Sequence, residues 1–285
     1  MKINVCIYIL LGVALLFGCS KREVHVPVWH QYAVEVVYKS PIDSAFSKTG
    51  PVYTTYVYSG DSLLRIKRSV KERDTINIPV GSYNFVSVNL SASGVRFGSM
   101  DKFREARLLL NSYGNMSVTT NPLRDVFSST VKEFYVAPFA PNTLNINLIN
   151  QVKNIEYQLI IEGAKDSLER CVITQHGVSK GFLFHNNQLI FDPAENTTIS
   201  AEASRVNNFT GTFSLLGVDP DKKELEIKFV YTNQKTQNTT LELNQLEDEY
   251  IYSKRLIIYI DITRINMELK ASVKSWIIVE DKINI

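Results

Sequence analysis

Short segments in which apolar and polar residues alternate are the feature that most limits how this chain can fold. Between positions 63 and 70, for example, the apolar Leu64 and Ile66 alternate with basic residues, and positions 144–148 alternate in the same way. A period of two places successive side chains on opposite faces of an extended chain, so each segment is typical of a half-buried strand. No segment shows an amphipathic helical pattern longer than about ten residues.

Strand-like segments of this kind recur along the whole chain and are separated by turn residues. The composition agrees, because 14 Tyr, 14 Phe and many Val, Ile and Thr residues favour strands over helices. Each half holds about six to eight short segments, which is the spacing of a β-sandwich. The segments expected to be strands are 32–38, 52–58, 63–70, 75–79, 82–90, 95–98, 129–136, 144–148, 155–162, 181–185, 188–191, 208–216, 224–231, 239–243 and 256–265.

The secondary structure of three segments is less clear, and a fourth segment marks a domain boundary. Residues 103–110 and 198–205 fit more than one element, whereas 164–170 fits a short helical turn. The run Pro138-Phe139-Ala140-Pro141 is the best linker, because two nearby prolines stiffen a connection and interrupt sheet pairing. The 285 residues suit two ordinary domains. We therefore predict an all-β protein with two tandem β-sandwich domains, 32–138 and 142–285.

The N-terminus has the features of an export signal. Lys2 supplies a positive start, and positions 3–18 are almost wholly apolar and uncharged, which is short of the ~20 residues of a membrane-spanning helix. The run from Leu16 to Cys19 resembles the lipobox of bacterial lipoproteins, in which the Cys is lipidated and becomes the new N-terminus. This predicts a signal peptide at 1–18, a lipid on Cys19 and a tether at 19–31. A plain secretory signal or membrane anchor with an incidental Cys is the alternative.

Cysteine usage fits an exported protein without disulfides. Of the three cysteines, Cys6 would leave with the signal and Cys19 would carry lipid, so Cys171 remains without an intrachain partner. We expect Cys171 to be a small buried apolar side chain. A nucleophilic role would require a histidine close to it in space.

Four parts of the sequence together have the layout of one protein family. They are the run 16–19, the turn Ile-Pro-Val-Gly-Ser-Tyr at 78–83, the segments 144–149 and 155–162 on either side of Asn154, and the ending 267–285 with its Ser-Trp pair. This layout resembles the fimbrillin-like lipoproteins of Bacteroidales, which are related to type V pilus subunits and anchors. The resemblance implies two transthyretin-like β-sandwich domains in tandem, attached to the outer membrane by lipid. It favours the cell surface over the periplasmic face, although Lys21 and Arg22 stand where surface-displayed members often carry acidic residues.

Four sites also resemble the Asp-Ser/Thr-aliphatic sequence that this bacterial group uses for O-glycosylation. About one such match is expected by chance. All four lie in expected turns or loops, where Asp-Ser is also ordinary turn chemistry. The acceptors would be Ser44, Ser62, Thr75 and Ser167.

The sequence carries no recognised catalytic, cofactor or metal motif. There is no glycine-rich phosphate loop, zinc-protease motif or nucleophile elbow, and a net charge of +2 argues against nucleic-acid binding. Asp219-Pro220-Asp221, with Glu224 and Glu226, could hold Ca²⁺ through oxygens, but Asp-Pro-Asp is also an ordinary turn sequence, and we favour the turn. We predict no enzyme activity, no cofactor and no metal site. Of the four histidines, His25 and His30 are expected at the surface, and His176 and His185, nine residues apart, lack the nearby Cys and carboxylate residues that a zinc site needs.

A structural or adhesive role in a pilus-like assembly, as an anchor or accessory subunit that assembles by strand addition, is the first functional hypothesis. The C-terminal stretch 273–285 is the donor candidate, with Val273, Ser275, Ile277 and Val279 on one face and Trp276 and Ile278 on the other. It would reach roughly 43 Å when extended. The alternative is that it pairs within its own domain as the last strand. Release of a pilus subunit would need cleavage after an arginine, and the available sites are Arg65, Arg68, Arg73 and Arg104.

A surface lipoprotein that binds glycans or another protein is the second hypothesis. Sandwich domains bind sugars through exposed aromatic side chains and polar loops. A row of solvent-facing aromatic residues would favour this role over assembly. The candidates are Trp29, Tyr53, Tyr56, Tyr58 and Tyr113.

Overall fold

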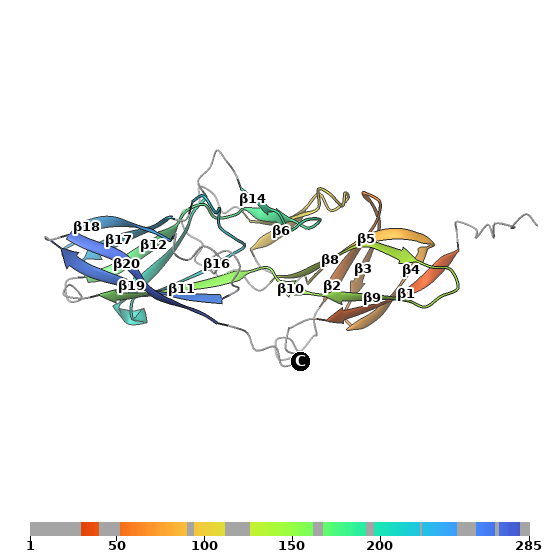
Figure 1. The fold of residues 1–285 in the computed structure, drawn as a ribbon, viewed down its shortest axis with the longest axis horizontal. Helices are drawn as coiled ribbons and strands as arrows, with labels where there is room; N and C mark the ends of the chain where they lie inside the picture. Colours follow the sequence, from red (N-terminus) through yellow and green to blue (C-terminus); the bar gives the residue numbers. More distant parts are fainter. Residues whose placement is uncertain are drawn as a thin grey trace, which may run out of the picture.

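The chain forms an elongated molecule built almost entirely of β-strands (Figure 1). The computed structural model describes residues 30–39, 52–89, 94–111, 126–161, 168–191, 197–222, 224–243, 255–265 and 268–279. Apart from the single 3-10 turn η2 (Arg205–Asn207), the regular elements of these residues are strands. N-terminal strands occupy one end of the long axis and C-terminal strands the other (Figure 1).

The N-terminal sandwich packs a three-stranded sheet against a five-stranded one. The first sheet has the order β4 (Arg73–Pro79), β1 (Gln31–Lys39), β9 (Asn142–Asn147). The second has the order β10 (Ile149–Asn150), β8 (Phe127–Val136), β5 (Gly81–Asn89), β2 (Tyr53–Ser59), β3 (Ser62–Ser69). One face of each sheet supplies the core, as strand alternation requires. Its members include Val34, Ile76, Ile146, Val57 and Phe85, each at most 1% exposed.

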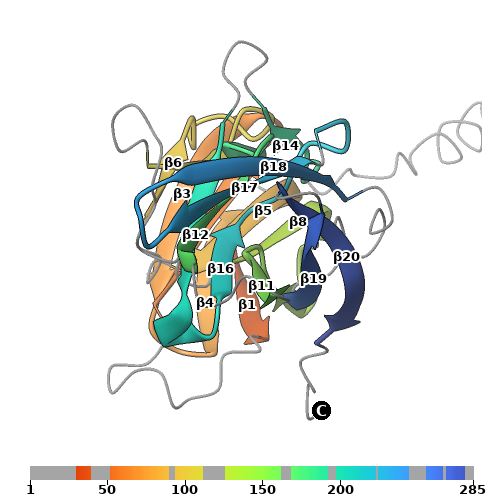
Figure 2. The same ribbon diagram turned by 90° about the vertical axis from the view of Figure 1, so that its left-hand side faces the viewer.

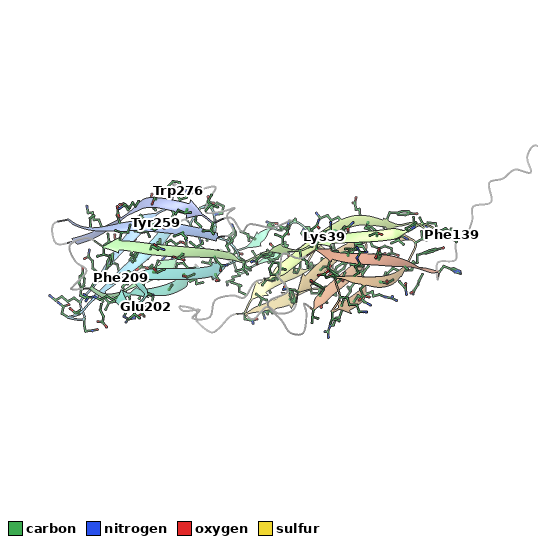
Figure 3. All side chains as sticks on the ribbon, turned by 90° about the horizontal axis from the view of Figure 1, so that it is seen from below. Lys39, Phe139, Glu202, Phe209, Tyr259 and Trp276 are labelled. Carbon is green, nitrogen blue, oxygen red and sulfur yellow. The ribbon has the colours of Figure 1, made fainter. Side chains whose placement is uncertain are left out.

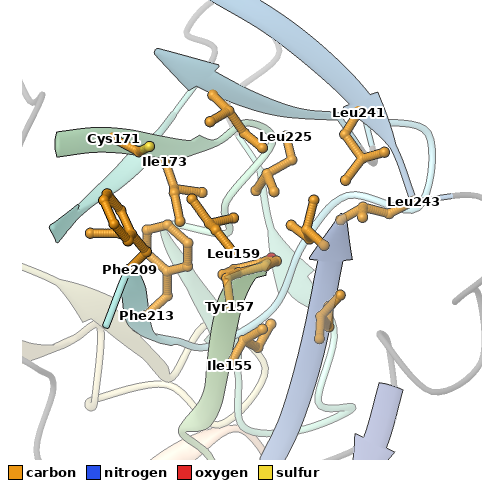
Figure 4. Packing of buried hydrophobic residues seen from close by; sticks show 14 of the residues in the cluster. Ile155, Tyr157, Leu159, Cys171, Ile173, Phe209, Phe213, Leu225, Leu241 and Leu243 are labelled. Atoms are coloured by element: carbon orange, nitrogen blue, oxygen red, sulfur yellow. The ribbon is translucent and has the colours of Figure 1, made fainter. Parts of the chain in front are cut away.

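The C-terminal sandwich packs two four-stranded sheets (Figure 2). One has the order β16 (Thr210–Leu215), β11 (Lys153–Ile161), β19 (Arg255–Ile265), β20 (Glu268–Ile278). The other has the order β15 (Ile199–Ser204), β12 (Leu168–Gln175), β17 (Glu224–Tyr231), β18 (Thr236–Glu242). Their inner faces meet in one apolar cluster (Figure 4), in which the rings of Tyr157 and Phe213 pack edge-on at 5.3 Å.

A fifth sheet joins the two sandwiches. It combines strands from both halves of the chain in the order β14 (Leu189–Ile190), β13 (Gly181–Leu183), β7 (Arg107–Leu110), β6 (Val95–Gly98). This sheet covers the outer side of the five-stranded sheet, and a separate apolar cluster there includes Tyr58, Val86, Phe103, Phe182 and Phe184. Apolar packing between the halves therefore makes the junction part of the fold.

The expected domain boundary at Pro138–Pro141 is wrong. After this turn the chain returns to the first sandwich, where β9 pairs in parallel with β1 and β10 pairs with β8. The prolines do end a strand, but the alternating apolar residues that follow complete the sheet beside β1. The chain leaves the N-terminal sandwich only after Asn150, and the fully buried Val152 then packs in the junction cluster.

Most of the expected strands are present, with small shifts at their ends. The unclear segments 103–110 and 198–205 contain the strands β7 and β15. The helical turn expected at 164–170 is wrong for its described part, because Leu168 already begins β12. This strand lies between β15 and β17, which supply hydrogen-bonding partners on both sides that the local sequence does not reveal. The hairpin across Asn186-Asn187 is confirmed by the pairing of Phe182 with Leu189.

Candidate functional site

The free edge of β20 is the strongest candidate for an interaction site. This strand ends the sheet order β16-β11-β19-β20, and within the described residues no strand pairs with its other edge, although β18 of the facing sheet lies near β20. It pairs antiparallel with β19 from Glu268 opposite Ile265 to Ile278 opposite Leu256. The described part of the expected donor segment therefore pairs within its own domain, while residues 280–285 lie outside the described residues.

A β-bulge changes which side chains of β20 face the core. The register shifts by one residue at Lys274, so Val273 and Trp276 both lie opposite core residues of β19, namely Ile260 and Ile258. Directly paired residues of an antiparallel sheet share a face. The prediction that Val273 and Trp276 face opposite ways is therefore wrong, because an extra residue reverses the alternation beyond it.

The C-terminal end of β20 leaves apolar side chains exposed to solvent. Val273 packs against the core, but Trp276 and Ile278 are 36% and 46% exposed although they lie on the core-facing side of the sheet. Ile277, on the outer face, is 49% exposed. Figure 3 shows Trp276 at the rim of the C-terminal sandwich. Three consecutive large apolar residues on a free edge are a template for pairing with another strand.

One edge of the N-terminal sandwich carries polar contacts between its two sheets, although Leu64 and Ile66 of its edge strand β3 are 46% and 51% exposed. Strands β3 and β4 end the two facing sheets, and the Arg65 guanidinium donates to the backbone carbonyl of Asn77 at 2.6 Å. The Lys67 ammonium lies 3.0 Å from the Asp74 carboxylate. Partial burial opposes ionisation of Asp74, but hydrogen bonds from the Thr75 N–H, from Ser69 and from Lys67 together lower its pKa. These contacts tie one sheet to the other.

The predicted glycosylation sites lie apart from β20. Ser62 is the exposed first residue of β3. Thr75 is exposed too, but it lies inside β4 rather than in a turn, and its backbone N–H donates to the Asp74 carboxylate at 2.7 Å. Glycosylation remains a prediction at both. The acceptors Ser44 and Ser167, and the lipidation residue Cys19, lie outside the described residues.

The residues considered as a nucleophile or as metal ligands have contacts typical of a core or a turn. Cys171 is fully buried in the C-terminal core, and desolvation raises its pKa to about 12, so it is not a poised nucleophile. His176 Nε2 lies 3.5 Å from a Glu226 carboxylate oxygen. Asp219 accepts a hydrogen bond from the Asp221 N–H at 3.0 Å, which is turn geometry. In the described part of the chain no three His, Cys, Asp or Glu side chains group together as metal ligands.

The aromatic residues considered for sugar binding do not form an exposed row. Tyr53 and Tyr58 are 2% and 0% exposed and belong to apolar clusters, and Tyr56 is half-buried. Trp29 and Tyr113 lie outside the described residues. Among the described elements there is also no apolar helix long enough to cross a bilayer.

Solved structures of other proteins share this fold over most of its length. A candidate adhesin from Bacteroides ovatus matches with a TM-score of 0.61 and 13% identity, covering 87% of this chain and 94% of the other. The fimbrial anchor protein Mfa2 from Porphyromonas gingivalis matches with a TM-score of 0.56 and 11% identity, covering 85% and 95%. The tip fimbrial protein Mfa3 from the same organism matches at 0.51 and 10%, covering 86% and 98%. No protein-family model and no curated protein sequence matches this chain.

At these identities the likeness establishes the fold. It confirms the all-β architecture that the resemblance to fimbrillin-like lipoproteins predicted.

The sequence pattern did not predict that the Trp276 side chain lies on the core-facing side of its sheet. Lys274 and Ser275, two consecutive polar residues between Val273 and Trp276, are the local sign of the bulge.

Proposed function

We propose that this protein is a non-catalytic structural or adhesive component of the cell envelope, and that it serves as an anchor or accessory subunit of a fimbrium. It would be held on the outer membrane by lipid on Cys19, with its folded part at the cell surface. The fold shared with a fimbrial anchor protein and a fimbrial tip protein supports this role. The partners would be other fimbrial subunits.

The observation that carries the proposal is the uncovered apolar end of β20. A partner strand that added to this edge would gain backbone hydrogen bonds along β20 and would cover Trp276 and Ile278. Because β20 is already paired with β19, the edge acts as an acceptor of a strand rather than as its donor. Assembly then needs no part of this fold to detach.

The positions of the arginines favour a chain that stays on its lipid. Arg65 and Arg68 lie inside β3, and Arg73 is the first residue of β4. A protease needs an accessible extended segment, so cleavage at these sites would first require the sheet edge to open. Arg104, in an exposed turn between β6 and β7, is the exception, because cleavage there would not require a sheet edge to open. Retention of the whole chain is the behaviour of an anchor or accessory subunit.

Lysine substitution at the edge tests the proposal. Trp276→Lys and Ile278→Lys each place a charge at a side chain that a partner strand would cover. We expect each substitution to abolish crosslinking of the protein into high-mass envelope assemblies. Val206→Lys is the matched control, because Val206 is 97% exposed on η2, away from β20. Folding is checked by thermal unfolding, since exposed side chains cost within about 0.5 kcal/mol. Unchanged crosslinking in both edge variants would refute strand addition at β20.

Intact-mass measurement of the native protein tests the anchoring. We expect an acylated species that begins at Cys19 and fractionates with the outer membrane. A lipid-free species beginning after an arginine would instead identify a polymerising subunit. A species beginning at Met1 would overturn the export argument.

A further inference from the structure

The far end of the N-terminal sandwich carries an exposed aromatic residue on a rigid turn. Phe139 lies between β8 and β9 at the outermost end of the molecule (Figure 3) and is 83% exposed. Its backbone has a positive φ of 59°, a left-handed conformation that costs an L-residue with a bulky side chain roughly 1 kcal/mol. A ring that contributes so little burial, in a conformation that costs stability, is not explained by folding.

The turn is held by the side chain of Asn142, which is 7% exposed. Its Oδ1 accepts from the Ala137 N–H at 2.9 Å, and its Nδ2 donates to the carbonyls of Ala137 and Ala140, each at 3.1 Å. The Tyr32 ring packs edge-on against the Phe139 ring at 5.8 Å. These contacts hold Phe139 in place and satisfy three backbone polar groups of the turn within the protein.

The segments that meet at this end are uncharged. Residue Gln31 pairs with Pro79, Gly81 with Val136, and the turn 137–141 lies beside them. The contributing residues 30–32, 79–82 and 135–142 include no Asp, Glu, Lys or Arg, although 21% of the chain is charged and about three would be expected. We define these three segments as the aromatic tip. Its exposed large side chains are Phe139 and Tyr135, the latter 59% exposed.

The chain enters the described structure at the aromatic tip. His30 follows Cys19 by eleven residues, and eleven residues reach at most about 40 Å when fully extended. Lipid on Cys19 would therefore keep the aromatic tip close to the bilayer. Between the two, Lys21 and Arg22 suit an anionic lipid surface, and Trp29 adds another aromatic residue.

We propose that the aromatic tip contacts the surface of the bilayer that holds the N-terminal lipid, with Phe139 inserted at the level of the headgroups. This rests on the proposed lipidation of Cys19. Aromatic side chains favour the membrane interface, and backbone groups already bonded by Asn142 lower the cost of leaving water. Two points of attachment would set the long axis away from the membrane. The β20 edge, in the other sandwich, would then be presented outward (Figure 1).

Tryptophan fluorescence in vesicles tests this contact. The acylated mature protein, with Trp29→Phe and Trp276→Phe, is reconstituted in phosphatidylcholine vesicles that contain phosphatidylglycerol and brominated acyl chains. Phe139→Trp is compared with Val206→Trp, a matched control that is 97% exposed in the other sandwich. We expect bromine to quench the tryptophan at position 139 about twofold, because interfacial side chains lie ~5–10 Å deep, and to leave the control unchanged.

A second measurement removes the lipid. In a non-acylated mature chain carrying Cys19→Ala, Phe139→Ala should lower vesicle partitioning about tenfold, the effect of losing part of the burial of one Phe ring. Val206→Ala should leave it unchanged. Thermal unfolding confirms that each variant is folded.

The outcomes separate the tip contact from the anchoring. Absence of quenching in a protein whose mass shows acylation and which floats with vesicles overturns the tip contact and leaves the anchor intact. If the emission of the tryptophan at position 139 shifts to the blue in native membranes but is not quenched by brominated lipid in vesicles, a protein partner covers the tip. That result would also overturn the membrane contact. A native protein without acyl chains overturns the anchoring, and the tip proposal falls with it.

Discussion

The two sandwiches of this molecule close their edges in different ways. In the N-terminal sandwich, Arg65 and Lys67 reach from one sheet to Asn77 and Asp74 on the other. In the C-terminal sandwich, the end of β20 leaves Trp276 and two isoleucines exposed. Charged side chains on an edge prevent pairing with foreign strands, whereas an uncovered apolar edge permits it. The two edges therefore differ in the polar contacts that join the facing sheets, while both β3 and β20 expose large apolar side chains.

The cores differ as well. The N-terminal core contains a buried chain of hydroxyl groups, in which Tyr38 bonds to Thr55 and Thr55 to Ser87, each at 2.8 Å. The C-terminal core is an aliphatic and aromatic cluster that includes the thiol of Cys171, and its Tyr157 hydroxyl donates a longer buried hydrogen bond to Gln175 Oε1 at 3.3 Å. Buried hydrogen bonds have strict geometric requirements, while apolar packing tolerates rearrangement better. The N-terminal core thus depends more on a chain of short buried hydrogen bonds.

The largest expected effect concerns Cys171, which reports opening of the C-terminal sandwich. Burial raises its pKa from 9.0 to about 12, so the thiolate fraction at pH 8 is about a thousandfold lower than for an exposed thiol. We expect iodoacetamide to modify the native mature protein at Cys171 only through opening, and the urea-unfolded protein rapidly. Mass spectrometry over time measures both rates. Rapid labelling in native conditions would show that this sandwich opens readily.

A substitution at the junction should destabilise both sandwiches. A Cβ atom on Gly181 would fall on the backbone carbonyl oxygen of Leu108, where β13 meets β7. We expect Gly181→Ala to lower the free energy of unfolding by at least about 3 kcal/mol and to split urea unfolding into two transitions. Gly98→Ala in the same sheet is the control, because its Cβ would meet mainly the flexible Arg107 side chain at 3.2 Å. Equal stability of the two variants would argue against a rigid junction.

The buried hydroxyl chain is tested by removing its central member. Thr55→Val keeps the shape of the side chain but leaves the Tyr38 and Ser87 hydroxyls without this partner, and we expect a loss of about 2 kcal/mol. Thr240→Val on the exposed face of β18 should change stability by less than about 0.5 kcal/mol. Chemical unfolding measures both variants. A similar, small loss of stability at the two sites would show that the buried hydroxyl chain does not stabilise the N-terminal core.

The smallest effect is expected at the β3–β4 edge of the N-terminal sandwich. The folded state lowers the pKa of Asp74 below its unfolded value of about 4, so its ionised form adds stability above that pH and loses it as the pH falls through the folded pKa. Asp74→Asn should cost about 1 kcal/mol at pH 7 and progressively less as the pH falls below about 4. Urea unfolding at both pH values measures this. A deficit that persists at low pH would show that charge is not its cause.

The local features of this protein were predictable from the sequence because they depend on neighbouring residues. Alternation at 63–70 and 144–148 predicted strands that are present as β3 and β9. The Asp219-Pro220-Asp221 turn and the burial of Cys171 follow from turn chemistry and side-chain type, and both are observed. An all-β fold is the sum of many such short segments.

Pairing between distant segments was decided only by the tertiary structure. A strand that is apolar on one face fits several neighbours equally well, so nothing near Asn142 reveals that β9 joins β1 rather than opening a second domain. The same holds for the sheet that combines β7 with β13, and for β12, which is stabilised by partners on both sides. The facing of Trp276 depends on one extra residue in its ladder. Alternation is a property of a single segment, whereas register, bulges and sheet order are set by contacts that form only when distant segments meet.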